Sequence, residues 1–136
     1  MADASTPDTQ AEPYVRDDAR ALLDMLKAMG RPPIEEVGPA AGREGMRVLT
    51  QLADTPPHDL AVIKDVTCPG PAGEIPCRLY DSRESRDAGP AVLFLHGGGF
   101  VVGDLEVYHA LCTEFAHRLD LPVLSVDYRL APEHPF

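Results

Sequence analysis

The feature that most constrains the fold is an unbroken apolar run, Ala91–Leu95, followed directly by His96 and three glycines. An apolar run without alternation is typical of a strand buried on both faces, as in a parallel sheet. Helical spacing then predicts a helix over about 106–119, and residues 122–126 form a second short apolar run. The apolar positions of that helix are Val107, Leu111, Phe115 and Leu119. Strand, helix and strand in this order predict a βαβ unit with a right-handed crossover, so the fold class is α/β.

A β-hairpin is expected ahead of the βαβ unit. Residues 60–68 are rich in β-branched side chains, and residues 75–80 alternate with a period of two. The segment between them, Pro69–Gly73, is dense in turn residues. The alternation predicts that Ile75, Cys77 and Leu79 face a core and that Pro76, Arg78 and Tyr80 do not. Pro76 lacks an N–H, which favours an edge position for its strand.

Two cysteines fall on the strands of this hairpin. A turn centred on Pro71–Ala72 would place Cys68 opposite Ile75, so the sulfurs of Cys68 and Cys77 would be out of register. Cys112 makes the number of cysteines odd, and none of the three has the CxxC spacing of a metal site. We expect free thiols, as in a reducing cytosol.

Two amphipathic helices are expected before the hairpin, over 14–29 and 44–53, with a loop rich in Gly, Pro and Ala at 34–43. Residues 1–13 are small, polar and acidic, which predicts a disordered lead-in. We assign all of these to an N-terminal segment, residues 1–57.

Composition excludes several classes of function. The length of 136 residues fits about one domain. With 12 basic and 22 acidic side chains, the net charge of -10 argues against a binder of nucleic acid or anionic membranes, because phosphates would repel such a surface. No apolar run approaches the ~20 residues that span a bilayer, and no signal peptide is visible. We therefore expect a cytoplasmic protein without a membrane span.

The chemistry-bearing stretch is His96-Gly97-Gly98-Gly99-Phe100. Consecutive glycines permit positive φ and close approach of a ligand, so adjacent N–H groups can converge on one anion. A dinucleotide-binding fingerprint would need glycine where Val102 stands, and a P-loop would need Gly-Lys-Ser/Thr, which the chain lacks. Two interpretations are left: a tight turn without a ligand, and the His-Gly-Gly-Gly oxyanion loop of esterases and lipases, which follows the third strand, as here.

Three segments together resemble the hormone-sensitive-lipase-like family of α/β-hydrolases, its bacterial esterase and lipase branch in particular. They are Leu93–Phe100, Gly103-Asp104 and Val126–Phe136, the last reading Val-Asp-Tyr-Arg-Leu-Ala-Pro-Glu-His-Pro-Phe. The resemblance is good from about residue 58 onward and loose over 14–57. It implies that residues 58–136 form the N-terminal part of an α/β-hydrolase core with a mostly parallel sheet. Residues 1–57 would then belong to a cap over the active site.

The resemblance also implies roles for the glycine loop. Gly98 and Gly99 would donate backbone N–H groups to the oxyanion, and Gly97 would let the loop bend. His96 would make an orienting hydrogen bond within the loop rather than act as a base. Phe100 would line the substrate pocket near the acyl group, with plain core packing as the alternative.

Four residues after the second apolar run are expected to be structural. Arg129 would bridge the carboxylates of Asp127 and Glu133 in an ion-pair network beneath the oxyanion strand, because its fork can bind two carboxylates. Tyr128 would anchor the same loop. A site for a substrate carboxylate is the alternative.

By resemblance, the parent protein would hydrolyse short- to medium-chain carboxylic esters by serine acyl transfer, with a small-molecule substrate and no metal or organic cofactor. None of the serines of this chain lies in a Gly-x-Ser-x-Gly elbow, and the family's catalytic Asp and His come later still. We expect a fragment that is inactive alone and is completed by a missing C-terminal part; whether the parent forms homo-oligomers is left open. The alternative is a non-catalytic relative that binds a small molecule.

Overall fold

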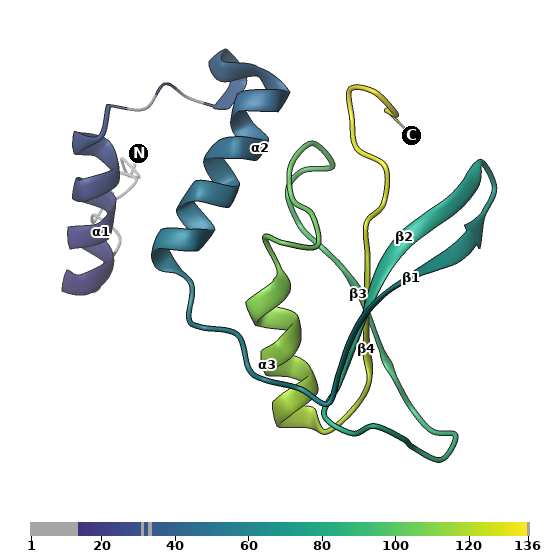
Figure 1. The fold of residues 1–136 in the computed structure, drawn as a ribbon. Coiled ribbons are helices and arrows are strands. Elements are labelled where there is room, and N and C mark those ends of the chain that lie inside the picture. The colour runs from purple at the N-terminus through teal and green to yellow at the C-terminus, as the bar shows by residue number, and fades with distance from the viewer. Residues whose placement is uncertain (1–13, 31, 33, 136) are drawn as a thin grey trace, which may run out of the picture. The chain divides into compact units, whose positions relative to one another are not determined.

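The computed structural model describes residues 14–30, 32 and 34–135 (Figure 1). The disordered start expected at 1–13 lies outside the described residues. The sheet and two of the three helices belong to one compact unit that begins at residue 34, and the first helix belongs to another. The expected division of the chain at residue 57 stays a prediction.

The first helix, α1 (Asp17–Ala28), shows end charges that suit the helix dipole. Asp17 and Asp18 lie in its first turn and Lys27 in its last. None of its residues is buried. A role for its apolar stripe in a cap therefore stays a prediction.

The second helix, α2 (Ile34–Ala53), begins ten residues earlier than the sequence indicates. The loop expected over 34–43 is wrong, because those residues are helical on both sides of a kink. Gly38 breaks the helical geometry with φ 76° and ψ 168°, and Pro39 starts the second segment. A proline suits a first helical turn, where its missing N–H costs no hydrogen bond.

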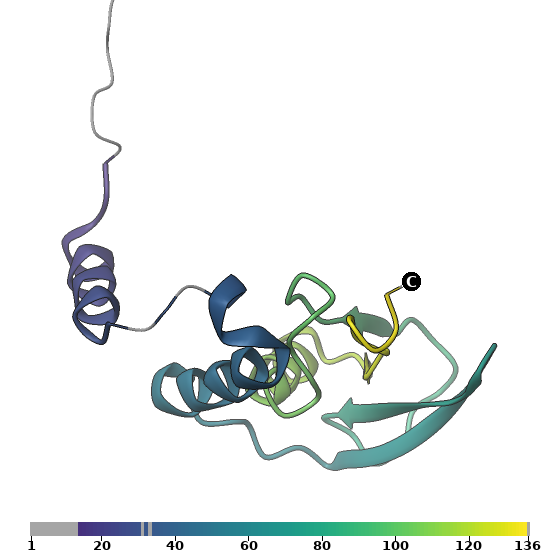
Figure 2. The ribbon, with the colours of Figure 1, turned by 90° about the horizontal axis from the view of Figure 1, so that it is seen from above.

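The four strands form one mixed sheet in the order β1-β2-β4-β3. These strands are β1 (Val62–Gly70), β2 (Gly73–Asp81), β3 (Val92–Leu95) and β4 (Val123–Val126), and α3 (His109–Leu119) connects the last two. Strands β3 and β4 are parallel, and the other two pairings are antiparallel. The α/β class and the hairpin plus βαβ order are thus confirmed. In Figures 1 and 2, α2 and α3 lie on one side of this unit and the β1–β2 hairpin on the other.

The hairpin has the register that a turn at Pro71–Ala72 requires. Gly70 opposes Gly73, and Cys68 opposes Ile75. All three cysteines are free, as expected. Burial raises the pKa of the Cys77 and Cys112 thiols to about 11, so both stay protonated at neutral pH.

The expected edge position of Pro76 is wrong, because β2 pairs with β1 on one side and β4 on the other. The Pro76 carbonyl accepts a hydrogen bond from the Asp127 amide, 2.9 Å away, one residue beyond the last ladder pair of Cys77 with Val126. The N and C=O of one strand residue point to the same side, so the missing N–H falls where β4 ends. The proline therefore removes only a terminal ladder bond.

The core lies between α3 and one face of the sheet. Its buried members are Tyr80, Cys112, Ala116 and Val123, with Phe94 and Phe115 among the side chains packed against them. Tyr80 was expected to face away from the core, but it is fully buried. The alternation misleads here because α3 covers the face of β2 that carries Tyr80.

The apolar run predicted that strand β3 is buried on both faces, but only one of its faces is buried. Val92 and Phe94 pack against the core, whereas Leu93 and Leu95 are 63% and 61% exposed. Within residues 34–135, α3 covers one face of this strand and no element covers the other. No helix among the described residues has the length and hydropathy needed to cross a membrane.

Candidate active site

The candidate site lies where the parallel strands β3 and β4 end. Loop 96–103 follows β3, and the segment 127–134 follows β4. Because the carboxyl ends of neighbouring parallel strands share one edge of the sheet, the two loops come together. The Ala131 amide donates a hydrogen bond to the Phe100 carbonyl over 2.8 Å.

Gly98 occupies a position that only glycine fits. Its φ is 131°, and a Cβ there would lie 1.9 Å from the carbonyl oxygen of Val102. Phe100 follows with a φ of 62°, which is uncommon for a residue other than glycine, and its side chain is 73% exposed. The plain core packing weighed for Phe100 is not what the structure shows.

The peptide between Gly98 and Gly99 is held by its carbonyl. The Gly98 oxygen accepts hydrogen bonds from the amides of Val101 and Val102, at 3.1 and 3.0 Å. In a trans peptide the N–H points opposite to the C=O, so the Gly99 N–H is directed away from that turn. Among the described residues, neither the Gly98 nor the Gly99 amide donates to a protein acceptor. These two donors are therefore available to a ligand.

His96 holds the peptide between Gly97 and Gly98. Its buried ring places Nδ1 2.9 Å from the Gly97 carbonyl oxygen, and since a carbonyl only accepts, Nδ1 carries the proton and donates. The same peptide carries the Gly98 N–H. The ring stacks on Tyr128 with 4.2 Å between centroids and lies 5.6 Å from Tyr108. His96 is thus fixed inside the protein by its neighbours.

Gly103 makes room for this arrangement, which the sequence reasoning did not foresee. A Cβ at Gly103 would lie 2.5 Å from His96 Nδ1 and 2.6 Å from the Gly97 oxygen. The signal in the sequence was a fourth glycine after the run of three, at a position without an obvious turn. Tyr128 completes the support, because its hydroxyl donates to the His96 carbonyl.

The expected network of Arg129 with two carboxylates is wrong. Glu133 pairs with Arg43 of α2, with 2.7 Å between Nη2 and Oε2. Arg129 is exposed, and within the described residues no ion pair includes Arg129 or Asp127. Burial raises the pKa of Asp127, with Asp104 adding to the shift.

Helix α2 supplies two arginines to the site region, and the sequence reasoning missed both. Arg47 binds Asp104, with 2.7 Å between Nη2 and Oδ2. The other carboxylate oxygen of Asp104 accepts the amides of Glu106 and Val107 at 3.0 and 2.9 Å. Burial alone would raise the pKa of Asp104, but the Val107 amide and Arg47 outweigh it and hold the pKa below its usual range.

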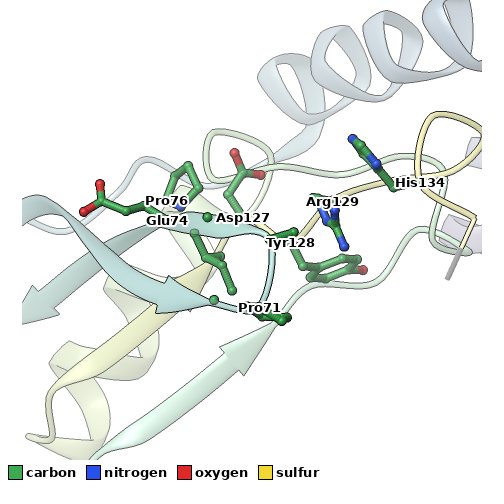
Figure 3. A pocket seen from close by; sticks show the side chains of 11 residues that line it. Pro71, Glu74, Pro76, Asp127, Tyr128, Arg129 and His134 are labelled. Carbon is green, nitrogen blue, oxygen red and sulfur yellow. The ribbon is translucent and has the colours of Figure 1, made fainter.

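A hollow of about 280 Å³ lies beside these loops, between the hairpin turn and the segment after β4. Figure 3 shows the side chains around it: Pro71, Glu74 and Pro76 come from the hairpin, and Asp127, Tyr128 and Arg129 come from the segment after β4. The glycines of loop 96–103 do not line it. Within the described residues, no group of three or more His, Cys, Asp or Glu side chains could hold a metal ion.

The chain is similar to known esterases. A family model described as the alpha/beta hydrolase fold matches residues 92–136. The carboxylic ester hydrolase LipN of Mycobacterium tuberculosis is 45% identical over 95 residues, which are 70% of this chain and 25% of LipN. Esterase LipI of the same organism is 44% identical over 126 residues, covering 88% of this chain and 38% of LipI.

Solved structures agree with these similarities. The structure of an ester hydrolase from the metagenome of Lake Arreo, complexed with a derivative of bipyridine phosphonate, matches with a TM-score of 0.80 and 35% identity. The match covers 90% of this chain and 40% of that protein. The chain therefore spans between 25% and 40% of the length of these three proteins.

Proposed function

We infer that this chain, which belongs to the hormone-sensitive-lipase-like family of α/β-hydrolases, supplies the oxyanion hole of a carboxylic ester hydrolase. The substrates we propose are small esters with short to medium acyl chains. The names of its relatives support ester hydrolysis, since LipN is a carboxylic ester hydrolase and LipI an esterase. The chain spans less than half of each relative, so the activity is proposed for a protein that contains it.

The observation that carries this proposal is the pair of amides without a protein acceptor. The carbonyls of both peptides are occupied, by His96 in one and by the amides of Val101 and Val102 in the other. The N–H groups of Gly98 and Gly99 are therefore held in place before any ligand arrives. Donors fixed in advance need no reorganisation during reaction, which is what stabilises a developing oxyanion.

In the proposed reaction, a serine from sequence outside these 136 residues attacks the ester carbonyl. The C=O π bond opens and its electron pair moves to oxygen, which becomes the oxyanion facing Gly98 and Gly99. A general base takes the serine proton and then gives it to the departing alcohol as the acyl-enzyme forms. Water repeats the sequence and releases the acid. Loss of one such donor costs roughly 2.7–4 kcal/mol in comparable sites.

His96, Gly97 and Tyr128 would support the hole without touching the reacting atoms. His96 sets the peptide that carries the Gly98 N–H, and Tyr128 holds the His96 carbonyl from the neighbouring loop. Phe100 is exposed beside them, which supports a contact with the acyl group.

The test uses the full-length protein that contains residues 1–136. We expect hydrolysis of p-nitrophenyl butyrate, slower turnover of the palmitate ester, and covalent labelling by a fluorophosphonate. Residues 1–136 expressed alone should show neither turnover nor labelling, because no serine here lies on a nucleophile elbow. A full-length protein that binds small esters without turnover or labelling would contradict hydrolysis and favour a binding role.

A further inference from the structure

We propose that Arg43 of α2 is a positioning residue for the oxyanion loop: it holds the Val101 carbonyl and through it the Gly99 amide. The inference rests on the proposed function, since it assigns a purpose to the geometry of that loop. It extends the site to a helix that the sequence placed outside the chemistry.

The guanidinium of Arg43 makes four hydrogen bonds to two loops. Its Nε donates to the Val101 carbonyl over 2.8 Å, and Nη2 donates to the Ala131 carbonyl over 2.9 Å. Nη1 and Nη2 bind the two carboxylate oxygens of Glu133 at 3.0 and 2.7 Å. One planar group thus fixes the loop after β3 relative to the segment after β4.

The link from Arg43 to the oxyanion donor runs through Val101 and the peptide between Gly98 and Gly99. Val101 has its carbonyl bound by Arg43 and its amide bound to the Gly98 oxygen, 3.1 Å away. The Gly98 oxygen belongs to the peptide whose N–H is that of Gly99. A shift of Val101 therefore rotates this peptide and moves the Gly99 N–H, even though Arg43 is remote from the oxyanion.

The arrangement requires arginine rather than any cation. The Nε donor and the two terminal nitrogens lie in one plane with fixed separations, so they meet Val101, Ala131 and Glu133 together. A lysine ammonium is a point charge and cannot replace Nε on the Val101 side. Glu133 locks the guanidinium orientation with its two parallel bonds.

Arg47 provides a matched control on the same helix. It also binds α2 to the segment between loop 96–103 and α3, through an ion pair with Asp104. No hydrogen bond within the described residues joins Arg47 to a carbonyl of the oxyanion loop. A comparison of variants at the two arginines distinguishes an effect of loosening α2 from an effect of moving Val101.

The experiment measures steady-state kinetics of the full-length protein with p-nitrophenyl butyrate for Arg43→Met, Arg43→Lys, Glu133→Gln and Arg47→Met. We expect kcat of Arg43→Met to fall about 30-fold with KM within about twofold, less than the 10²–10³-fold loss for a deleted donor. Arg43→Lys should recover little, Glu133→Gln should lose about threefold, and Arg47→Met should stay within about threefold. Fluorophosphonate titration of active sites corrects each kcat for folded enzyme.

A second readout does not depend on turnover. Hydrogen exchange of the amides in residues 98–102 should be faster in Arg43→Met and unchanged in Arg47→Met. Equal kcat and equal exchange in the two variants would overturn the inference, as would full rescue by Arg43→Lys. If the wild-type protein hydrolyses no ester, the proposed function fails, and the exchange comparison alone decides the positioning role. If Arg43→Met does not fold, Arg43→Lys and Glu133→Gln carry the same comparison.

Discussion

Two loops that are each held by an arginine lie at opposite ends of the parallel strands β3 and β4, and their functions differ. At the amino ends, Arg86 binds both carboxylate oxygens of Asp81 at 2.7 and 2.8 Å. It also binds the carbonyl of Asp120, just after α3, at 2.7 Å. At the carboxyl ends, Arg43 binds carbonyls and a carboxylate in the same manner. Arginine forks therefore do not by themselves mark a functional site.

The difference lies in the backbone of each loop: the glycine loop has positive φ at Gly98, Gly99 and Phe100, whereas residues 81–90 have no positive φ. At the Asp81 end the polar groups bind one another and hold the loop closed, an arrangement that we call the latch. The Arg83 amide binds Asp81, and the side chains of Ser82 and Arg83 bind Asp120. The glycine loop at the other end uses its carbonyls, and the Gly98 and Gly99 amides are among those that donate to no protein acceptor within the described residues. Glycines at positive φ let a ligand approach adjacent N–H groups closely, which the arginine-held loop after β2 does not offer.

The largest effect that would sharpen this comparison is expected at Gly98. Replacement by Ala would place Cβ 1.9 Å from the Val102 carbonyl oxygen, so the loop would have to move. We expect Gly98→Ala in the full-length protein to lower kcat for p-nitrophenyl butyrate about 1,000-fold, the loss associated with an oxyanion donor. Circular dichroism should show that the sheet is retained.

Gly99→Ala is the matched control for that variant. A Cβ at Gly99 meets nothing within 4 Å, and its N–H is retained. Its φ of 60° costs about 1–2 kcal/mol for a residue other than glycine, so we expect kcat within about tenfold of wild type. Equal losses in the two variants would show that backbone strain, rather than the fit of Gly98, limits activity.

A smaller effect, on stability rather than on turnover, is expected at Arg86. Arg86→Met removes the main group that holds the pKa of the Asp81 carboxyl below its usual range, and it leaves that largely buried carboxylate with the Arg83 amide but no cationic partner. We expect a lower free energy of unfolding, measured by urea denaturation of the full-length protein. Turnover should stay within about twofold. A drop in kcat as large as that of Arg43→Met would contradict the division between a latch and a site.

The extent to which sequence predicts this protein follows the range of the interactions. The strand before His96 and the hairpin register depend on neighbours in sequence, and local patterns were sufficient for them. Arg43 was missed because its acceptors lie 58 to 90 residues away, on loops that only the folded sheet brings to α2. Arg129 was given that role because it is near Glu133 in sequence.

Burial was predicted least well where it depends on the order of the strands. Tyr80 and Leu93 lie in segments with clear patterns, yet one is buried and the other 63% exposed. Pattern alone does not say which face α3 covers or that β2 lies inside the sheet. These facts follow from pairings between distant segments, which no window of the sequence contains.

The smallest effect is expected from the titration of Glu133, and it tests the Arg43 fork by itself. The hydrogen bond from Arg43 lowers the pKa of Glu133 from 4.5 to about 2. A carboxyl whose pKa is lower in the folded state stabilises that state above its unfolded pKa and loses this contribution as pH falls through the folded value. The difference in Tm between wild type and Glu133→Gln should therefore be largest above pH 4.5 and should disappear by about pH 2. Glu84→Gln, an exposed substitution of the same charge, is measured alongside as the control. A difference that stays constant or widens on acidification would mean that Arg43 and Glu133 are not paired in solution, and the fork would then lose the group that orients it.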